Sequence, residues 1–297
     1  MTKQAIVTKS TGSFYELLFE NTVITARIRG KIKLDNRRTT NPISVGDWVD
    51  FIRTDDDFMI TKIYPRKNYL IRKSVNLSKE THIIASNIDL ACFIFTYNEP
   101  STSLGFLDRF LITCEAYQIK PLIIINKIDI YSEKDLQIIE NIISEYQKIG
   151  YSFIKVSAKN KDNIIELQSK ITNLISVFFG HSGSGKSTLV NALDSNFNLK
   201  IGDISAFSDK GQHTTTFAQM YTWDFGGYII DTPGIKEFGV VDMHKDELQD
   251  YFPDIFVLKG KCKFHNCLHL NEPYCAVKGA IRESRYNSYV KLMDEIV

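Results

Sequence analysis

The feature that most constrains the fold of this chain is the glycine-rich segment Gly180-His-Ser-Gly-Ser-Gly-Lys-Ser187. It has both glycines, the lysine and the serine of the phosphate-binding loop (P-loop) pattern. A β-branched and aromatic run at 177–179 precedes it, and a helix-compatible run follows it. A strand, a loop with few Cβ atoms and a helix N-terminus together direct backbone N–H groups and the helix dipole at phosphate oxygens. The segment therefore predicts a nucleotide site in an α/β domain.

The residues around this loop alternate between apolar, strand-like runs and helical patterns. We predict strands at 89–96, 121–126, 153–157 and 177–180, helices at 104–118, 132–148, 163–175 and from Lys186 onward, and a hairpin around residues 225–227. Such alternation favours right-handed βαβ crossovers and a parallel sheet with helices on both faces. We expect this α/β domain to span residues 87–242.

Two smaller segments flank the α/β domain. Residues 1–70 carry five short strand patterns separated by turn residues, which predict an OB-like or SH3-like β-barrel. The predicted strands are 4–9, 14–19, 23–33, 47–53 and 58–64. We expect residues 71–86 to be a linker, and residues 243–297 to form a helical domain with a cysteine cluster and a final helix from about Lys278 to Glu295.

Composition and charge limit the class of protein. With 43% hydrophobic and 24% charged residues, the chain has the composition of a soluble globular protein. It has neither an apolar run of about 20 residues nor a signal-peptide pattern, so we expect a cytoplasmic protein without a membrane partner. The net charge is +6 over residues 1–80, −8 over 81–257 and +3 over 258–297. Basic segments on both sides of an acidic centre are compatible with nucleic-acid binding by the flanks.

A second motif selects the base. Asn126-Lys127-Ile128-Asp129 follows the predicted strand 121–126, at the sheet edge where α/β proteins bind ligands. The Asp129 carboxylate can accept hydrogen bonds from both N–H groups on the Watson–Crick edge of guanine, which adenine does not present, and Asn126 can bond another ring edge. The motif therefore favours GTP, because an ATP-using enzyme would require it to be accidental.

Three further loops fit the same site. Ser157-Ala158-Lys159 would close over the base, and Asp231-Thr-Pro-Gly234 would place a carboxylate near Mg²⁺ and an N–H at the γ-phosphate. In the P-loop, Lys186 would reach the β- and γ-phosphates and Ser187 would bind Mg²⁺, together with Thr215 or Thr214. The predicted GTP-binding residues are Asn126, Lys127, Asp129, Ser157, Ala158, Lys159, Gly180, His181, Ser182, Gly183, Ser184, Gly185, Lys186, Ser187, Thr188, Asp231 and Gly234.

The catalytic group is harder to assign. Ras-type GTPases orient the attacking water with a glutamine directly after the Asp-x-x-Gly glycine, where this chain has Ile235. His213 can accept a proton near neutral pH, and we predict it to be catalytic together with Lys186 and Thr214. The alternatives are that His213 is only a surface histidine, and that the group comes from residues 235–240 or from a partner.

The cysteine cluster predicts a structural metal. Cys262, Cys267 and Cys275 offer three thiolates within fourteen residues, and one histidine completes the closed ligand set of a tetrahedral zinc. Spacing leaves both His265 and His269 open as the fourth ligand. The other two cysteines, Cys92 and Cys114, lie in apolar runs and are expected in the core.

The guanine motif precedes the P-loop, so the order of motifs resembles that of the circularly permuted GTPases. The barrel-like start, Ala85-Ser-Asn87-Ile-Asp89, Gly211-Gln-His-Thr-Thr-Thr216 and the tail from Cys262 resemble the ribosome small-subunit-dependent GTPase family (RsgA). This resemblance implies His269 as the fourth ligand of one zinc per chain. It also implies a monomeric GTP hydrolase that is stimulated by the small ribosomal subunit, binds its rRNA through the flanking domains, and leaves on hydrolysis late in 30S assembly. The alternative is an RNA-binding nucleotide switch with negligible turnover.

Overall fold

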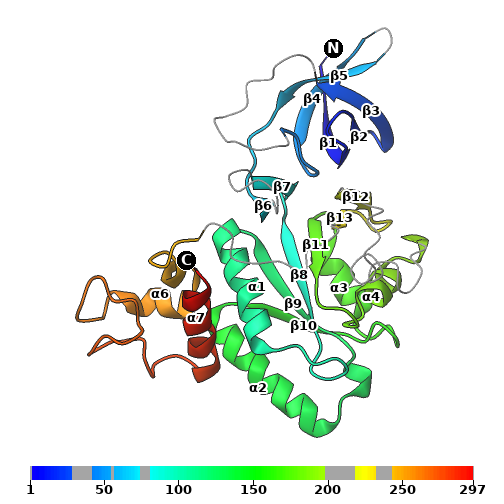
Figure 1. Ribbon diagram of the computed structural model, residues 1–297. Coiled ribbons are helices and arrows are strands. Elements are labelled where there is room, and N and C mark those ends of the chain that lie inside the picture. Colours follow the sequence, from blue (N-terminus) through cyan, green and yellow to red (C-terminus); the bar gives the residue numbers. More distant parts are fainter. Residues whose placement is uncertain are drawn as a thin grey trace. The chain divides into compact units, whose positions relative to one another are not determined.

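The computed structural model describes residues 2–28, 42–54, 57–73, 81–197, 218–231 and 243–296 (Figure 1). It divides into two compact units, each assembled from separate stretches of the chain. The first unit comprises Met1–Cys92, Ile164–Phe179 and Lys186–Glu237, and the second comprises Phe93–Asn163, Gly180–Gly185 and Phe238–Val297. The domain boundaries expected from the sequence stay predictions.

The first unit begins with a closed five-stranded barrel. Its strands are β1 (Lys3–Ser10), β2 (Tyr15–Phe19), β3 (Thr22–Ile28), β4 (Trp48–Arg53) and β5 (Phe58–Ile63). They pair in the cycle β1-β2-β3-β5-β4-β1, antiparallel except for the parallel pair β3–β5. Alternate residues such as Val7, Leu17 and Phe51 point into the barrel and form its core. The predicted five-stranded OB-like barrel is therefore present.

A two-stranded hairpin follows the barrel. Strands β6 (Tyr69–Lys73) and β7 (Thr81–Ser86) pair antiparallel, although the sequence predicts only a linker over 71–86. Long-range contacts hold this hairpin: the Ser86 N–H donates to the Val45 carbonyl at 2.8 Å, and the Ser44 hydroxyl donates to the Ile83 carbonyl at 3.2 Å. Local sequence patterns cannot reveal such contacts, so the strands were missed.

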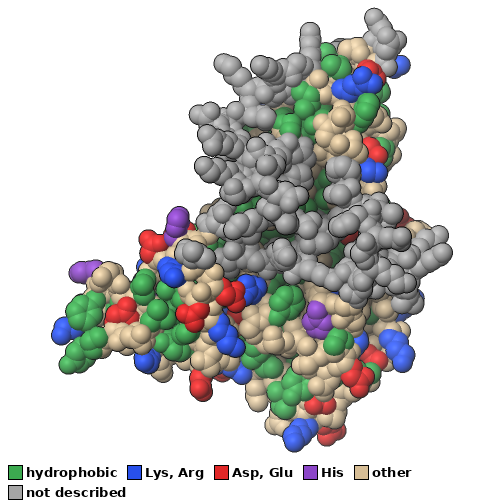
Figure 2. Space-filling view, in the orientation of Figure 1, with side chains coloured by type: hydrophobic (Ala, Val, Ile, Leu, Met, Phe, Trp, Pro, Cys, Tyr) green, Lys and Arg blue, Asp and Glu red, His purple; other side chains and the backbone are tan. Residues whose placement is uncertain are grey.

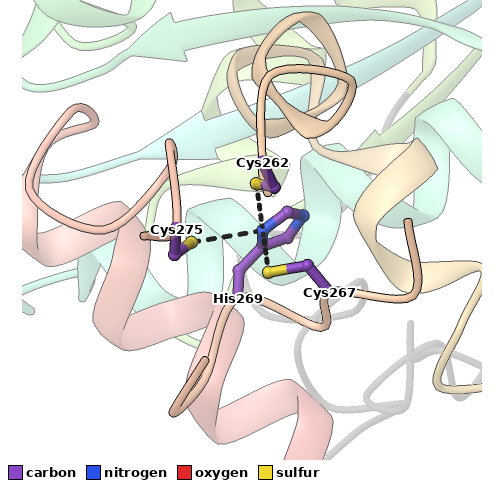
Figure 3. Close-up of side chains that lie close together, drawn as sticks. All are labelled: Cys262, Cys267, His269 and Cys275. Carbon is purple, nitrogen blue, oxygen red and sulfur yellow. Dashed lines mark hydrogen bonds between the residues drawn. The ribbon is translucent and has the colours of Figure 1, made fainter. Parts of the chain in front are cut away.

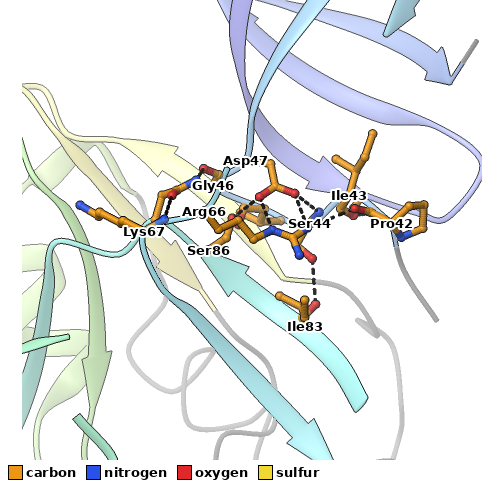
Figure 4. A network of polar contacts seen from close by, with 12 residues as sticks. Pro42, Ile43, Ser44, Gly46, Asp47, Arg66, Lys67, Ile83 and Ser86 are labelled. Atoms are coloured by element: carbon orange, nitrogen blue, oxygen red, sulfur yellow. Dashed lines mark hydrogen bonds and ion pairs between the residues drawn. The ribbon is translucent and has the colours of Figure 1, made fainter. Parts of the chain in front are cut away.

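A buried polar network joins the barrel to the hairpin (Figure 4). Arg66 donates to both oxygens of the fully buried Asp47 carboxylate, at 2.6 Å and 2.5 Å. The Ser86 hydroxyl donates to Asp47 at 2.6 Å and the Ser44 N–H does so at 2.8 Å. At Gly46, where φ is +90°, an added Cβ would lie 2.1 Å from the Ser86 carbonyl oxygen. Only glycine fits between these segments.

The rest of the first unit leads to the P-loop. At the start of β8 (Leu90–Phe95), Asp89 and Ile175 exchange two hydrogen bonds of 2.8 Å, which place β11 (Ile175–Phe179) alongside. β11 runs parallel to β13 (Tyr228–Asp231), which forms the predicted hairpin with β12 (Gln219–Thr222). Helix α3 (Ile164–Ile171) is shorter than predicted because Asn173 is left-handed and Ile175 already belongs to β11. Helix α4 (Lys186–Leu193) begins at Lys186, as predicted.

The second unit carries the remaining α/β elements. β9 (Lys120–Ile125) and β10 (Ser152–Lys155) are parallel, and the Asn126 N–H donates to the carbonyl of Phe95 at the end of β8. Helix α1 (Leu104–Tyr117) is capped by the Ser103 side chain. Helix α2 (Glu133–Ile149) begins with a capping box of Ser132 and Asp135. These elements confirm the predicted alternation and bring the ends of β8, β9 and β10 to one sheet edge.

The C-terminal residues pack on α1. They form the short helices η4 (Leu248–Tyr251) and α6 (Pro253–Lys259) and the longer α7 (Glu283–Glu295), which begins later than predicted. Ile112 of α1 shares a buried cluster with Phe252, Tyr289 and Leu292. Figure 1 shows α7 beside α1. In the part of the chain that the structure describes, no helix combines the length and the hydrophobicity needed to cross a bilayer.

Candidate functional site

Asn126 links three of the predicted nucleotide-binding segments within the second unit. Its side chain is 1% exposed at the end of β9. The amide donates to the Ser184 carbonyl of the P-loop at 3.0 Å, and its oxygen accepts the Ala158 N–H at 3.2 Å. The sequence predicts a contact between Asn126 and the base, whereas these bonds tie the guanine motif to the P-loop and to the 157–159 segment.

Asp129 is the accessible acid of the guanine motif. It lies in the single turn η1 (Ile128–Ile130) and is exposed. One carboxylate oxygen accepts a 2.6 Å hydrogen bond from the buried Ser157 hydroxyl, which also accepts the Asn160 N–H at 3.0 Å. Ser157 therefore fixes the orientation of a carboxylate that solvent and ligands can reach. This arrangement suits an acceptor for two N–H groups of a base.

The P-loop closes tightly on the Asn126 side chain. Gly185 has φ +90°, and a Cβ added there would lie 2.5 Å from the Asn126 amide nitrogen. Ser184 is buried, whereas Ser182 and Gly183 are exposed. Glycine at 185 is therefore required both by backbone conformation and by the approach of Asn126.

The residues after the loop enter α4 in the first unit. Lys186 opens this helix, and burial lowers the pKa of its ammonium group to about 8. Desolvation disfavours the charge, so a phosphate at this position would restore it. Ser187 is buried in the first turn of α4, Thr188 follows it, and Asp231 ends β13.

Several predicted site residues lie outside the described part of the chain. These are the catalytic candidate His213, the magnesium candidates Thr214 and Thr215, the γ-phosphate contact Gly234, and Ile235. Their roles stay predictions.

The metal cluster is assembled in the second unit (Figure 3). The His269 Nδ1 atom lies 3.5, 3.4 and 3.4 Å from the Sγ atoms of Cys262, Cys267 and Cys275. In a tetrahedron with Zn–S of about 2.3 Å and Zn–N of about 2.05 Å, each N···S distance is about 3.6 Å. The four ligand atoms lie within 4.8 Å of one another, so they fit one zinc ion. His265 does not belong to this cluster.

A second layer of hydrogen bonds orients the cluster. The Gln249 side-chain oxygen lies 3.0 Å from His269 Nε2, so Nε2 donates while Nδ1 faces the sulfur atoms. The Ala276 N–H points at Cys262 Sγ at 3.3 Å. Glu272 accepts from the N–H groups of Leu268 and Leu270 on either side of His269. Sequence reasoning missed Gln249 and Glu272. Neither residue is a metal ligand, and no sequence signal shows that a glutamine or a glutamate will hydrogen-bond to the residues around a ligand.

The two remaining cysteines behave as predicted. Cys92 and Cys114 are fully buried among apolar residues. Burial raises the pKa of the Cys92 thiol, so it is an unreactive core residue.

Comparison with known proteins identifies the family. The RsgA N-terminal domain matches residues 4–58, and the RsgA GTPase domain matches residues 63–241. The small ribosomal subunit biogenesis GTPase RsgA of Flavobacterium psychrophilum is 50% identical over 97% of this chain and 92% of that protein. The protein of the same name from Christiangramia forsetii is 47% identical over 98% and 96% of the two chains.

Solved structures agree with this assignment. YjeQ from Thermotoga maritima matches with a TM-score of 0.80 and 32% identity, over 100% of this chain and 99% of that one. YloQ, described as a circularly permuted GTPase, matches with a TM-score of 0.76 and 29% identity, over 100% and 95% of the chains. The predicted permuted fold is thus confirmed. The order of motifs, the sequence relatives and the structural neighbours together show that this chain is a GTPase of the RsgA family.

Proposed function

We propose that this GTPase acts in small ribosomal subunit biogenesis and binds GTP where the guanine motif meets the P-loop. The observation that supports this site most strongly is the pair of bonds by which Asn126 joins Ser184 and Ala158. Two segments with different tasks, base recognition and phosphate binding, thereby converge on one side chain. The names of the relatives supply the biological setting.

Each segment has a chemical task in this proposal. Asp129 accepts the two N–H groups of guanine, with Lys127 and Lys159 beside it. The backbone of 180–185 and the first turn of α4 surround the phosphates, and Lys186 neutralises their charge. Ser187, together with Thr214 or Thr215, would hold the Mg²⁺ ion that accompanies the nucleotide, and Asp231 would support it through water; when bound, the ion would neutralise phosphate charge.

Hydrolysis requires a group that orients water. We assign this task to His213, because the position after Gly234 carries Ile235, which has no side-chain polar atom. GTP turnover by the isolated protein should therefore be slow, and an ordered partner surface should raise it.

One zinc per chain fits the cluster of Cys262, Cys267, His269 and Cys275. When bound, zinc supplies folding free energy to the C-terminal residues. The ligand set is closed, so the site is structural and leaves no position for a reacting water.

The partner that best matches the flanks is ribosomal RNA. Residues 1–80 carry +6 and residues 258–297 carry +3. Around the metal cluster, Tyr274 is 77% exposed and Lys263 lies 4.7 Å from its ring centre. Figure 2 shows hydrophobic, basic and acidic side chains interspersed over this C-terminal region. Exposed aromatic rings beside lysines suit stacked bases and phosphates. We also propose that the protein is a monomer and acts in the cytoplasm, because ribosomal subunits assemble there.

The test is nucleotide turnover measured with GTP and with ATP, each with and without purified small ribosomal subunits. We expect slow GTP hydrolysis that small subunits raise strongly, and no comparable ATP hydrolysis. Binding of GTP with no turnover in either condition would favour an RNA-binding nucleotide switch instead.

Asp129→Asn provides the matched test of base recognition. An amide can donate to the carbonyl that xanthine has in place of the guanine amino group, so xanthine nucleotide should bind better and GTP worse. Affinity is measured by titration with fluorescent GDP and XDP analogues. Unchanged GDP affinity would remove Asp129 from the base site.

A further inference from the structure

One loop contacts both nucleotide-binding motifs without belonging to either. Residues 97–102 connect β8 to α1. On the guanine side, the Tyr131 hydroxyl accepts the Tyr97 N–H at 2.9 Å and donates to the Asn126 carbonyl at 2.8 Å. The Lys127 ammonium group also donates to the Glu99 carbonyl. The start of this loop is therefore attached to the guanine motif.

The other end of the same loop is attached to the P-loop. The Thr102 hydroxyl lies 2.6 Å from His181 Nε2, and His181 Nδ1 lies 2.9 Å from the Ser182 carbonyl oxygen. A carbonyl oxygen only accepts, so Nδ1 carries a proton and donates to Ser182, while Nε2 and the Thr102 hydroxyl share the other hydrogen bond. The Thr102 oxygen in turn accepts the Thr96 N–H at 3.1 Å. The end of this loop is therefore attached to the P-loop through Thr102 and His181.

We propose that the 97–102 loop holds the guanine motif and the P-loop in register for GTP, and that the two positioning residues are Thr102 within the loop and Tyr131, which binds the loop from the guanine side. This inference rests on the proposed function. The bond between Asn126 and Ser184 is a direct link between the motifs, and the loop adds a second route between the same two segments. Two separate connections fix both the distance between the two motifs and their relative orientation, whereas a single hydrogen bond lets one motif rotate about it.

Among the guanine-side contacts, the buried one passes through a single atom, the Tyr131 hydroxyl oxygen. Tyr131 is 8% exposed, and burial raises the pKa of its phenol, so the hydroxyl stays protonated and can accept and donate together. Tyr131→Phe would remove this oxygen, so the Tyr97 N–H would lose this acceptor and the Asn126 carbonyl would lose this donor. Because a lost buried partner is costly, we expect GDP and GTP affinity to fall about 5- to 20-fold.

The decisive experiment is a double-mutant cycle in the full-length chain. GDP dissociation constants are measured for the parent, Tyr131→Phe, Thr102→Val and the double variant. If the loop acts as one connection, losing the contact at either end removes the whole connection. Each single substitution should then weaken GDP binding about 5- to 20-fold. The double variant should bind no more than about twofold more weakly than the weaker single variant. Effects that multiply, or singles within twofold of the parent, would overturn the proposal.

Three controls separate positioning from general damage. Thr102→Ser keeps the hydroxyl and should restore parent affinity. Tyr289→Phe removes a buried hydroxyl that donates to the Leu268 carbonyl at 2.8 Å in the C-terminal region, and it should leave GDP affinity unchanged. When GTP is titrated in the presence of small subunits, kcat of Tyr131→Phe should stay within about twofold while KM rises, as expected for lost ground-state binding.

The outcomes also distinguish this inference from the proposed function. A parent protein that does not bind guanine nucleotide would overturn both. A parent that binds GDP, together with variants that bind it equally well, would overturn only the role of the 97–102 loop.

Discussion

The buried arginine of the last helix provides the sharpest test of how the C-terminal residues are held. The Arg285 side chain is fully buried and donates to Asp108 of α1 at 2.8 Å and to both oxygens of Asp254 of α6, at 2.7 Å and 3.2 Å. Asp108 is fully buried as well, and the Tyr146 hydroxyl donates to the same oxygen at 2.7 Å. One cation therefore balances two carboxylates that water hardly reaches.

Arg285→Met keeps most of the apolar stem and removes the charge. It strands the Asp108 and Asp254 carboxylates in the interior, and breaking a buried ion pair in this way costs about 3–5 kcal/mol. Replacing Asp108 by asparagine in the same variant removes one stranded charge and should recover part of this loss. Arg109→Met is the matched control, because the Arg109–Glu295 ion pair also joins α1 to α7 but is partly exposed. That change should cost no more than about 1 kcal/mol.

Hydrogen–deuterium exchange of the α7 amides is the appropriate assay. The two tryptophans, Trp48 and Trp223, both lie in the first unit, so their fluorescence does not report on α7. A loss of 3–5 kcal/mol corresponds to protection factors in α7 that are lower by a factor of about 10² or more. If Arg285→Met exchanged like Arg109→Met, the buried ion network would not be what holds α7 on α1.

Three other changes have expected outcomes. Gly46→Ala places a Cβ 2.1 Å from the Ser86 carbonyl oxygen at a residue with φ +90°. It should lower the free energy of unfolding of the first unit by about 2–4 kcal/mol, measured by urea unfolding with tryptophan fluorescence. A loss below about 1 kcal/mol would contradict the close packing. Gln249→Ala removes the acceptor of His269 Nε2 and should weaken zinc binding about 10- to 100-fold in competition with a chromophoric chelator, whereas parent affinity would exclude an orienting role. Removing zinc with a chelator should raise amide exchange over 258–296, and unchanged exchange would show that the fold there does not depend on metal.

Much of the fold follows from local patterns in the sequence. Every residue of β8 is buried, which matches its continuous apolar run, and α2 begins at the capping box that its sequence contains. The predicted elements are wrong where tertiary contacts determine the secondary structure. The apolar periodicity of α3 continues past Ile171, but left-handed Asn173 ends the helix and Ile175 pairs with Tyr228 in β13. The β6–β7 hairpin depends on barrel residues about 40 positions away, as in the 41-residue separation of Ser86 and Val45.

The candidate site divides in the same way. Residues whose type and spacing carry the chemistry, such as Asp129 and Cys267, are recognisable without a structure. Positioning residues are not, because a hydroxyl or amide gives no signal of a distant partner. Tyr131 meets Tyr97 across 34 positions, Thr102 meets His181 across 79, and Gln249 meets His269 across 20. Only the folded chain brings these pairs together.

Ion pairs with a buried carboxylate attach both the N-terminal barrel and the C-terminal helix α7 to their neighbouring elements. At the barrel, the buried Asp47 carboxylate pairs with Arg66 and accepts the Ser86 hydroxyl of the hairpin, and α7 is joined to α1 through Arg285 and Asp108. Buried ion pairs add little net stability compared with apolar contacts, but they lose several kcal/mol when the partners separate. These ion pairs therefore oppose displacement of the paired segments more than they add to the stability of the fold. The polar contacts beyond the barrel continue to Asp89, which accepts the Ile175 N–H at the start of β11. β11 leads directly into Gly180, so these polar contacts extend from the barrel to the strand that precedes the P-loop.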